Sequence, residues 1–358
     1  MASNSFGEIF RISTWGESHG DSLGVLIDGC PAGLNLSNTM IQKELQRRRP
    51  GKRDFTSPRK EKDSAEILSG VFQGKSTGAP ILIRIANKDH DSSKYEDIKD
   101  LLRPGHANYS YLKKYGSFDY RGGGRASARE TAARVAAGAI AKELLSQNGI
   151  QTISWLSQIS KTSSNIPLSR VLELKEQINE NPFFCPDEQA FEEMKKDLQQ
   201  NSLDSLGGVV SFAAFNLPPG LGEPIYLKLE ALLASAMMSI PAAKAFEIGE
   251  GFEAALMKGS QHNDLFIDQD QTATNHAGGV LAGISTGMPI WGRVAFKPSS
   301  SIKLAQNTSD INGNEREFKI PEGSRHDPCV AIRATPVVEA MLALVLADAL
   351  LMNRSAKL

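Results

Sequence analysis

The chain has 358 residues, of which 41% are hydrophobic and 23% are charged, and this composition is typical of a soluble globular protein. Its 40 lysine and arginine residues nearly balance its 41 aspartate and glutamate residues, so the molecule as a whole offers no basic field for nucleic acid or membrane surfaces. Any anion that binds must therefore be held by local clusters of cationic side chains.

Cysteine usage and the N-terminal sequence indicate a cytoplasmic protein. Cys30, Cys185 and Cys329 are odd in number and widely spaced, with no CxxC pair, which argues against a disulfide framework and against structural zinc. Residues 1–12 lack the apolar core of a signal peptide. No run approaches the roughly 18 apolar residues of a membrane-spanning helix, so we expect no membrane association.

The N-terminal part of the chain is predicted to combine short strands with one helix. A cap on Ser37 or Thr39 is expected to start the helix. It is expected to end at about Arg48, because Pro50-Gly51 follows. Residues 47–62 are strongly basic and poor in apolar side chains, which indicates an exposed, mobile loop. The hydrophobic patterns predict strands over residues 6–12, 23–27, 67–72 and 79–85.

The rest of the chain also mixes helices with strands. Residues 103–120 contain Pro, Gly, Asn and four tyrosines and are predicted to form an ordered loop. An alanine-rich run from Ala126 favours a helix that ends at Asn148-Gly149. Thr335-Pro336 is typical of a helix start, and that helix is expected to reach about Met352. The remaining predicted elements are helices over 168–180, 187–200 and 225–238, a strand over 207–215, and glycine-rich strands within 278–294.

This order of elements lacks the regular alternation of a βαβ chain, and it favours an α+β layered architecture over a doubly wound sheet. We expect a single domain over residues 1–358. The polar, irregular segment at about 160–205 is expected to be peripheral to it.

The most informative segment is 120–131, where Gly122, Gly123 and Gly124 lead into the alanine-rich helix. A glycine loop that opens a helix points unpaired N–H groups and the positive end of the helix dipole at one spot, which suits phosphate or carboxylate. Arg125 and Arg129 are expected to share a helix face at i, i+4 beside that spot. The alternative is a surface helix start with incidental arginines.

Two histidines lie on glycine-containing turns where a ligand could approach them. His19 stands between Ser18 and Gly20, and a histidine titrates near neutral pH, so it could donate a proton to a leaving group. His106 follows Pro104-Gly105, with Arg103 alongside. For each of them the alternative is a loop histidine whose hydrogen bonds serve the structure alone.

Two further clusters carry charge. Asp327 stands between Arg325 and Arg333, so it could act as a base beside an anion site, or it could form an ordinary ion pair. The arginines of residues 47–53 could form a nucleic-acid arm. No aromatic residues interleave with them, and the fork of an arginine suits a small polyanion better.

Several common site motifs are absent from the sequence. There is no HExxH and no other set of metal ligands at useful spacing, so no metal is expected. GxxxxGK[ST], the full GxGxxG pattern and GxSxG are also missing, which argues against nucleotide hydrolysis, a Rossmann dinucleotide site and an acyl-transfer serine.

Taken in order, these motifs resemble the chorismate synthase family over nearly the whole chain, from Phe6 to about Leu350. Three signatures carry the resemblance: Gly16–Gly20 continuing to Asp28–Pro31, then Gly122–Thr131, then Arg325–Cys329 continuing to Glu339. Between them stand Arg47–Gly51, Arg103–His106, Asn275–Gly279 and Lys297–Ser301.

The resemblance implies the last step of the shikimate pathway, in which 5-enolpyruvylshikimate 3-phosphate loses phosphate by 1,4-elimination to give chorismate. Reduced FMN is required although there is no net redox change. By resemblance, His19 protonates the departing phosphate, His106 lies by the flavin ring, and Asp327 acts with the flavin in removing the substrate proton. The implied fold is a layered β-α-β sandwich with helices between antiparallel sheets, and the implied assembly is a homotetramer.

The resemblance also assigns binding residues. Those for FMN are Arg125, Ala126, Ser127, Pro241, Ala242, Ala282, Lys297, Pro298, Ser299, Ser300, Ser301 and Arg325. Those for the substrate are Arg48, Arg103, Arg129 and Arg333, and those for NADPH, as a possible reductant, are Arg48 and Arg53, with Arg59 as the alternative to Arg53. Asn108 departs from the aspartate of many members, so a changed hydrogen bond near His106 is expected. Pro241 replaces the asparagine of some members, which removes a side-chain contact with FMN.

Two other functions stay open at the level of sequence. An ordinary FMN oxidoreductase would use the same flavin contacts but would carry hydride to a product. A nucleic-acid binding protein would use residues 47–62 and would show steeply salt-dependent binding.

Overall fold

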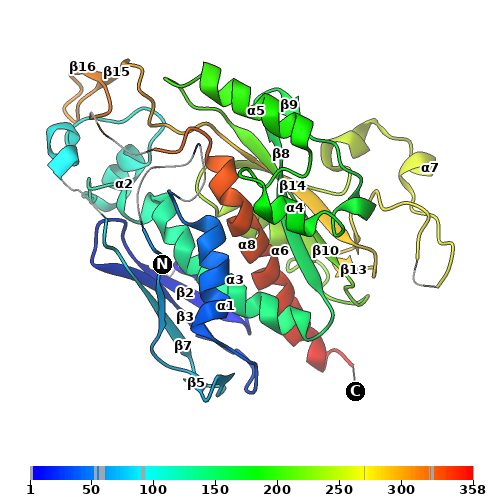
Figure 1. Cartoon of the computed structure of the whole chain (residues 1–358). Coiled ribbons are helices and arrows are strands. Elements are labelled where there is room, and N and C mark those ends of the chain that lie inside the picture. The colour runs from blue at the N-terminus through cyan, green and yellow to red at the C-terminus, as the bar shows by residue number, and fades with distance from the viewer. Residues whose placement is uncertain are drawn as a thin grey trace.

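The computed structural model describes residues 3–51, 55, 61–89, 93–269, 271–321, 323 and 326–357. Two antiparallel sheets stand on either side of a layer of helices (Figure 1). This arrangement confirms the predicted α+β sandwich.

The first sheet comes from the N-terminal part of the chain. Val25 and Ile83 are partners on adjacent strands, and both are fully buried against the helices, because every second residue of these strands is apolar. The strands in spatial order are β1 (Ser5–Phe6), β2 (Arg11–Gly16), β3 (Ser22–Asp28), β7 (Ile81–Ala86) and β4 (Ala65–Ile67).

The second sheet covers the opposite side of the helices. Its strands in spatial order are β11 (Ala243–Ile248), β14 (Ile290–Phe296), β10 (Gly208–Phe215), β8 (Gln151–Ile159) and β9 (Thr162–Ser163). Three short hairpins complete the described strands: β5 (Val71–Phe72) with β6 (Lys75–Ser76), β12 (Val280–Leu281) with β13 (Ile284–Ser285), and β15 (Gln306–Ser309) with β16 (Glu315–Phe318).

The helix layer is built on two long helices that cross closely. A Cβ atom on Gly138 would lie 2.4 Å from the Cβ of Ala340, so only a glycine at this position lets the two helices approach. These helices are α3 (Thr131–Ser146) and α8 (Val330–Met352), flanked by α1 (Asn38–Arg48) and α6 (Leu229–Met238). The other described helices are α2 (Asn108–Tyr115), α4 (Lys175–Glu180), α5 (Glu188–Gln200) and α7 (Gly259–His262).

The apolar character of α8 follows from its place in the core. The stretch Val330–Ser355 is long and apolar enough to cross a membrane by length and composition, which corrects the expectation that no run approaches that length. However, 89% of its most apolar window is buried inside the protein. The stretch is the central core helix of the sandwich (Figure 1).

Two buried acidic residues tie α8 to the rest of the fold. Near its C-terminal end, Asp348 accepts hydrogen bonds of 2.8 Å from three successive backbone N–H groups, those of residues 8–10. In its middle, Glu339 pairs with Arg47 of α1 at 2.8 Å and with Lys142 of α3 at 2.5 Å. Burial would raise the pKa of Glu339, but these two cations hold it at about 2.

The segment at about 160–205 lies against the outer face of the second sheet. Ile153 and Trp155 of β8 turn away from α8 and form a second, smaller core with Ile178 and Phe184. Side chains of α5, which include Met194, join the main core at the edge of the same sheet.

Several predicted elements differ from the structure. The alanine-rich helix begins at Thr131, not at Ala126, and the helix predicted over 168–180 is divided into a 3₁₀ turn, Leu168–Arg170, and α4. The last helix begins at Val330, not at Thr335, and Pro336 lies inside it. Within 103–120, residues 108–115 form a helix, which Gly116 ends in the left-handed conformation; this terminating glycine was the overlooked signal. The strand predicted over 6–12 is divided between β1 and β2, and that over 67–72 between β4 and β5, because turns interrupt both runs.

The described ends of the basic segment are less exposed than predicted, whereas residues 52–54 and 56–60 lie outside the described residues. Arg48 is 1% exposed, and Glu61 and Asp63, at the end of the segment, are 3% and 1% exposed. The reason is that Arg48 pairs with Asp63 at 2.7 Å, while Glu61 accepts from the backbone N–H groups of Lys88 and Asp89; a count of charges along the sequence cannot show these contacts. Ser37 caps α1, because its hydroxyl accepts from the N–H of Met40 at 3.2 Å.

Candidate active site

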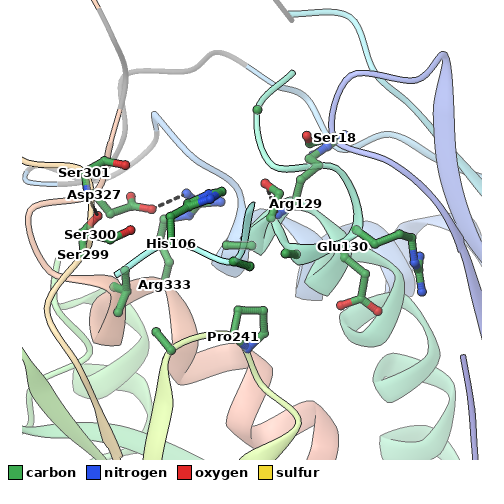
Figure 2. A pocket seen from close by; sticks show the side chains of 18 of the residues that line it. Ser18, His106, Arg129, Glu130, Pro241, Ser299, Ser300, Ser301, Asp327 and Arg333 are labelled. Carbon is green, nitrogen blue, oxygen red and sulfur yellow. Dashed lines mark hydrogen bonds and ion pairs between the residues drawn. The ribbon is translucent and has the colours of Figure 1, made fainter. Parts of the chain in front are cut away.

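A cavity of about 850 Å³ opens at one end of the helix layer. Ser299, Ser300, Ser301 and Asp327 lie on one side of it in Figure 2, and Ser18 and Arg129 lie on the other. The predicted site residues that line it are His19, Arg103, His106, Arg125, Ala126, Ser127, Arg129, Pro241, Ala242, Lys297, Pro298, Ser299, Ser300, Ser301, Asp327 and Arg333. The fold therefore brings segments from the whole length of the chain to one place.

The glycine turn separates the two predicted histidines. Gly122 has a φ of +64°, and a Cβ atom on it would lie 2.4 Å from Cδ2 and Nε2 of His19. Gly123 has a φ of +92°, and its Cβ would lie 3.2 Å from Nε2 of His106. Both the left-handed backbone and the close approach require glycine at these positions.

His19 lies on the loop between β2 and β3, which the glycine turn and Asn87 hold together. The residue is 9% exposed, and its ring meets the ring of Tyr95 edge to face, with centroids 5.3 Å apart. The adjacent Ser18 donates from its N–H to the carbonyl of Gly124 at 3.4 Å. The loop is thus fixed to the wall of the cavity on both sides of the imidazole.

His106 is held as a neutral imidazole. Its backbone N–H closes a turn onto the carbonyl of Arg103 at 3.1 Å, and its Nδ1 accepts from the N–H of Asn108 at 3.3 Å, which leaves the ring proton on Nε2. Burial, reinforced by the positive charges of Arg103, His326 and Lys297, lowers the pKa of His106 to about 3.

The side chain of Asn108 does not reach the imidazole. Its Nδ2 donates to the carbonyl of Leu101 at 2.9 Å, a bond that an aspartate could not make. The expected change in hydrogen bonding near His106 therefore falls on the preceding loop, while the backbone of Asn108 contacts the ring.

Arg125 and Arg129 do not share a helix face, in contrast to the prediction. They lie on two successive 3₁₀ turns, Gly124–Ala126 and Ala128–Glu130, separated by the extended backbone of Ser127. Arg125 reaches the edge of β2, where it donates to Thr14 Oγ1 at 2.8 Å and to the Gly16 carbonyl at 3.1 Å. The glycine turn thus directs the two guanidinium groups to different walls of the cavity.

Arg129 is 4% exposed and belongs to a buried ionic network at the base of the cavity. Its Nη1 pairs with Oδ1 of Asp63, whose Oδ2 accepts from Arg48 Nη1 at 2.7 Å. Arg48 also donates from Nε to Thr131 Oγ1 at 3.1 Å. Burial would raise the pKa of Asp63, but Arg48 and Arg129 hold it below its ordinary value.

Asp327 and Arg333 form an ion pair, which was the alternative interpretation of the Arg325–Arg333 cluster. Arg333 Nη1 donates to Asp327 Oδ2 at 2.7 Å (Figure 2), and Arg333 Nε lies 3.4 Å from the carbonyl of Arg48. Both side chains nevertheless line the cavity, next to His106 and His326. The arginine therefore sets the orientation of the carboxylate toward the cavity.

Three cations of the cavity wall have neutral partners. Arg103 Nη2 donates to Ser301 Oγ at 2.8 Å, Lys297 Nζ donates to the Gly105 carbonyl at 2.6 Å, and Arg125 bonds to β2 as described. Within the described part of the chain, none of the three has a carboxylate partner. The cavity therefore carries uncompensated positive charge that suits an anionic ligand.

Of the predicted site residues that the structure describes, Arg48 and Ala282 are not among those that line the cavity. Arg48 is 1% exposed and donates from Nη1 to Oδ2 of Asp63 at 2.7 Å, and its contact with the substrate stays a prediction. Ala282 lies on the exposed turn of the β12–β13 hairpin, with a φ of +51°. Arg53, Arg59 and Arg325 fall outside the described residues.

Three residues that the sequence did not single out lie at or beside the cavity: His326 lines it, and Asp63 and Asn87 contact Arg129. Asp63 is an acid at the end of a basic segment, Asn87 follows directly after a buried strand, and His326 adjoins Asp327. Each of these residues can be noticed in the sequence, but the sequence does not show which groups its side chain contacts. Burial and the nearby Arg103 lower the pKa of His326 to about 4.

Comparisons with known proteins agree with this geometry. The family described as chorismate synthase matches residues 10–351. Chorismate synthase of Protochlamydia amoebophila (strain UWE25) is 56% identical over 100% of both chains, and that of Roseiflexus castenholzii (strain DSM 13941 / HLO8) is 50% identical over 100% of this chain and 99% of its own. A solved structure described as a crystal structure of chorismate synthase superposes with a TM-score of 0.77 at 35% identity, covering 98% of this chain and 93% of that one. The chain therefore belongs to the chorismate synthase family of carbon–oxygen lyases, which act in the shikimate pathway of aromatic amino-acid biosynthesis.

Proposed function

We propose that the chain eliminates phosphate from 5-enolpyruvylshikimate 3-phosphate to give chorismate, with reduced FMN bound beside the substrate. The observation that carries this proposal is the charge of the cavity: Arg103, Arg125 and Lys297 line it with neutral partners. A substrate with two carboxylates and a phosphate would supply the missing counter-charge. Within the same cavity, His19 and Asp327 offer an acid and a base.

The cavity residues fit a flavin nucleotide. A volume of about 850 Å³ lies within the usual range for pockets that hold cofactor-sized ligands. Ala126, Ala242 and the glycine turn present small surfaces on which a planar ring can lie. The hydroxyls of residues 299–301, with Lys297, are the donors that a phosphate requires. Residues 125–127, 241–242 and 297–301 would therefore hold FMN.

The steps of the proposed reaction are assigned to side chains that line the cavity. Reduced FMN, when bound, supplies electron density that assists departure of the phosphate. His19 donates a proton to the phosphate as the carbon–oxygen bond breaks, and Asp327, oriented by Arg333, takes up the proton of the broken carbon–hydrogen bond. Neutral His106 offers its Nε2–H to the flavin. Arg103 and Arg129 bind the substrate anions, and Arg48 pairs with Asp63, which also pairs with Arg129.

Three further features complete the proposal. The active form is a homotetramer of single-domain subunits in the cytoplasm. Because Ala282 is exposed and outside the cavity of its own chain, a contact between Ala282 and FMN would have to come from a second copy. NADPH serves as the reductant of FMN, with Arg53 as its contact.

Anaerobic incubation of the protein with the substrate and reduced FMN tests the reaction. The expected result is release of one phosphate for each chorismate formed, while the absorbance of the reduced flavin is unchanged at the end of turnover. Stoichiometric oxidation of the flavin would instead favour the FMN oxidoreductase. Absence of both phosphate release and flavin oxidation would refute the proposal.

Replacement of Arg103 tests the observation that carries the proposal. Arg103→Leu removes a cation without a carboxylate partner, so KM for the substrate is expected to rise at least about tenfold, the usual scale for a charge-assisted contact. Arg84→Leu is the matched control, because Arg84 lies on the outer face of β7 and contacts Glu66 only at 3.9 Å. Equal KM values for the two variants would contradict the assignment.

A further inference from the structure

Asn87 makes contacts that no described function of the site explains. It follows β7 directly and is 8% exposed. Its Nδ2 donates to the carbonyls of Glu17 at 3.0 Å and of Gly20 at 2.7 Å, the residues that bracket His19 in the loop. Its Oδ1 accepts from Nε of Arg129 at 2.8 Å. One amide thus connects the loop of the candidate acid to a candidate anion-binding arginine.

The hydrogen-bond partners of Asn87 allow the amide a single orientation. Both N–H groups of Nδ2 are used by carbonyl oxygens, and Oδ1 faces a guanidinium, so a flipped amide would place donor against donor and acceptor against acceptor. A buried amide that uses both donors and its acceptor oxygen in this way fixes the relative position of the groups that it joins.

Arg129 is held on three edges of its guanidinium. Nε bonds to Asn87, Nη1 to Asp63, and Nη2 lies 3.4 Å from the carbonyl of Ala86. An arginine has five N–H groups, so these described partners use three and leave one on each terminal nitrogen. A bidentate contact with an anion in the cavity needs that pair of donors.

We propose that Asn87 is a positioning residue that holds the His19 loop and Arg129 at a fixed separation, so that one phosphate group meets both the proton donor and the guanidinium. The proposal rests on the proposed elimination for its kinetic consequence. Its geometric part, the coupling of the loop to Arg129, stands independently of the substrate.

Asn87→Asp is expected to disrupt the contacts with the His19 loop and to keep the contact with Arg129. The introduced carboxylate keeps an acceptor for Arg129 Nε but places a negative oxygen against the carbonyls of Glu17 and Gly20, so the His19 loop is displaced while Arg129 stays in place. We expect kcat to fall at least about tenfold with KM for the substrate within about threefold, the pattern of an interaction needed only in the transition state. Asn87→Ala removes both bonds, so kcat is expected to fall and KM to rise together.

Asn181→Ala is the matched control. Asn181 is also 8% exposed, and its Oδ1 accepts from the backbone N–H groups of Phe183 at 2.8 Å and Cys185 at 3.1 Å, away from the cavity. The control is expected to lose stability as the Asn87 variants do, but to keep the kcat and KM of the parent protein. A purely structural role for Asn87 would make all three variants alike.

Nuclear magnetic resonance of the His19 Hε1 proton gives a readout that does not depend on activity, with the signal assigned from His19→Gln. It is expected to shift in Asn87→Asp and Asn87→Ala but not in Asn181→Ala. An unshifted signal in both Asn87 variants, or a parent-like kcat in both, would overturn the proposal. If the parent protein itself does not convert the substrate, the proposed function fails, and the resonance alone decides the role of Asn87.

Discussion

Acidification from pH 7 to pH 5 is expected to destabilise the ligand-free protein through His106. The pKa of this imidazole is lowered from 6.5 to about 3 by burial and by the positive groups that face it. In this pH range His106 binds a proton in the unfolded chain but not in the folded protein, so the free energy of unfolding falls as the pH falls. The loss starts near pH 6.5 and ends near the folded pKa.

The size of this effect follows from the two pKa values. At pH 5 the solution is about 1.5 units below the unfolded pKa, and each unit corresponds to about 1.36 kcal/mol, which gives a loss of about 2 kcal/mol from His106. His326, with its pKa lowered to about 4, adds a loss of similar size over the same range. Carboxylates with lowered pKa values, such as Asp63 and Glu339, protonate at lower pH and do not contribute here.

Urea denaturation of the parent protein and of His106→Gln at pH 7, 6 and 5 measures the effect. The quantity of interest is the difference in pH dependence, because the substitution itself changes the stability at every pH. We expect the decline between pH 7 and pH 5 to be about 2 kcal/mol smaller in His106→Gln. Parallel curves for the two proteins would show that His106 titrates normally in the folded state and would refute this reasoning.

Three other outcomes follow from close contacts. Gly122→Ala is expected to lower the free energy of unfolding by at least about 1 kcal/mol more than Gly33→Ala does, and to abolish turnover. A Cβ at Gly122 meets His19, whereas one at Gly33, also at positive φ, meets nothing within 4 Å. Thermal unfolding compares the two variants, and equal losses of stability would contradict the clash. Glu339→Gln is expected to lower the free energy of unfolding by about 3 kcal/mol in urea, because Arg47 and Lys142 are then left to share one carboxylate, that of Glu44. A loss below about 1 kcal/mol would mean that Glu44 and water compensate the two cations. Asp348→Asn is expected to speed hydrogen exchange of the amides of residues 8–10, which it now binds, and unchanged exchange there would disprove this anchoring role.

Part of the fold could be predicted because local chemistry alone decides it. The alternating isoleucines of β7 and the hydroxyl cap of α1 form where the sequence indicates, and the alanine-rich α3 forms but begins at Thr131 instead of Ala126. The prediction was wrong where tertiary packing outweighs local preference. Pro336 is accommodated inside α8 because the helix is buried over most of its length, so the packing of its neighbours compensates for one missing hydrogen bond.

The same division applies to the candidate site. Motif order was enough to bring His19, His106 and Asp327 into one hypothesis, since each belongs to a signature that can be read from adjacent residues. It could not show that Arg48 pairs with Asp63, because the two residues lie 15 positions apart and no motif links them. Nor could it reveal Asn87, whose partners lie 42 to 70 residues away.

The amino-acid sequence by itself determined the family, the α+β class and the types of side chain available for an anionic substrate. Only the tertiary structure decided which cations are already neutralised and which remain for a ligand, because that depends on distances between residues far apart in the chain. The glycine turn illustrates both levels. Its three glycines predict a close approach of the backbone, and the fold specifies that His19 and His106 are the groups approached.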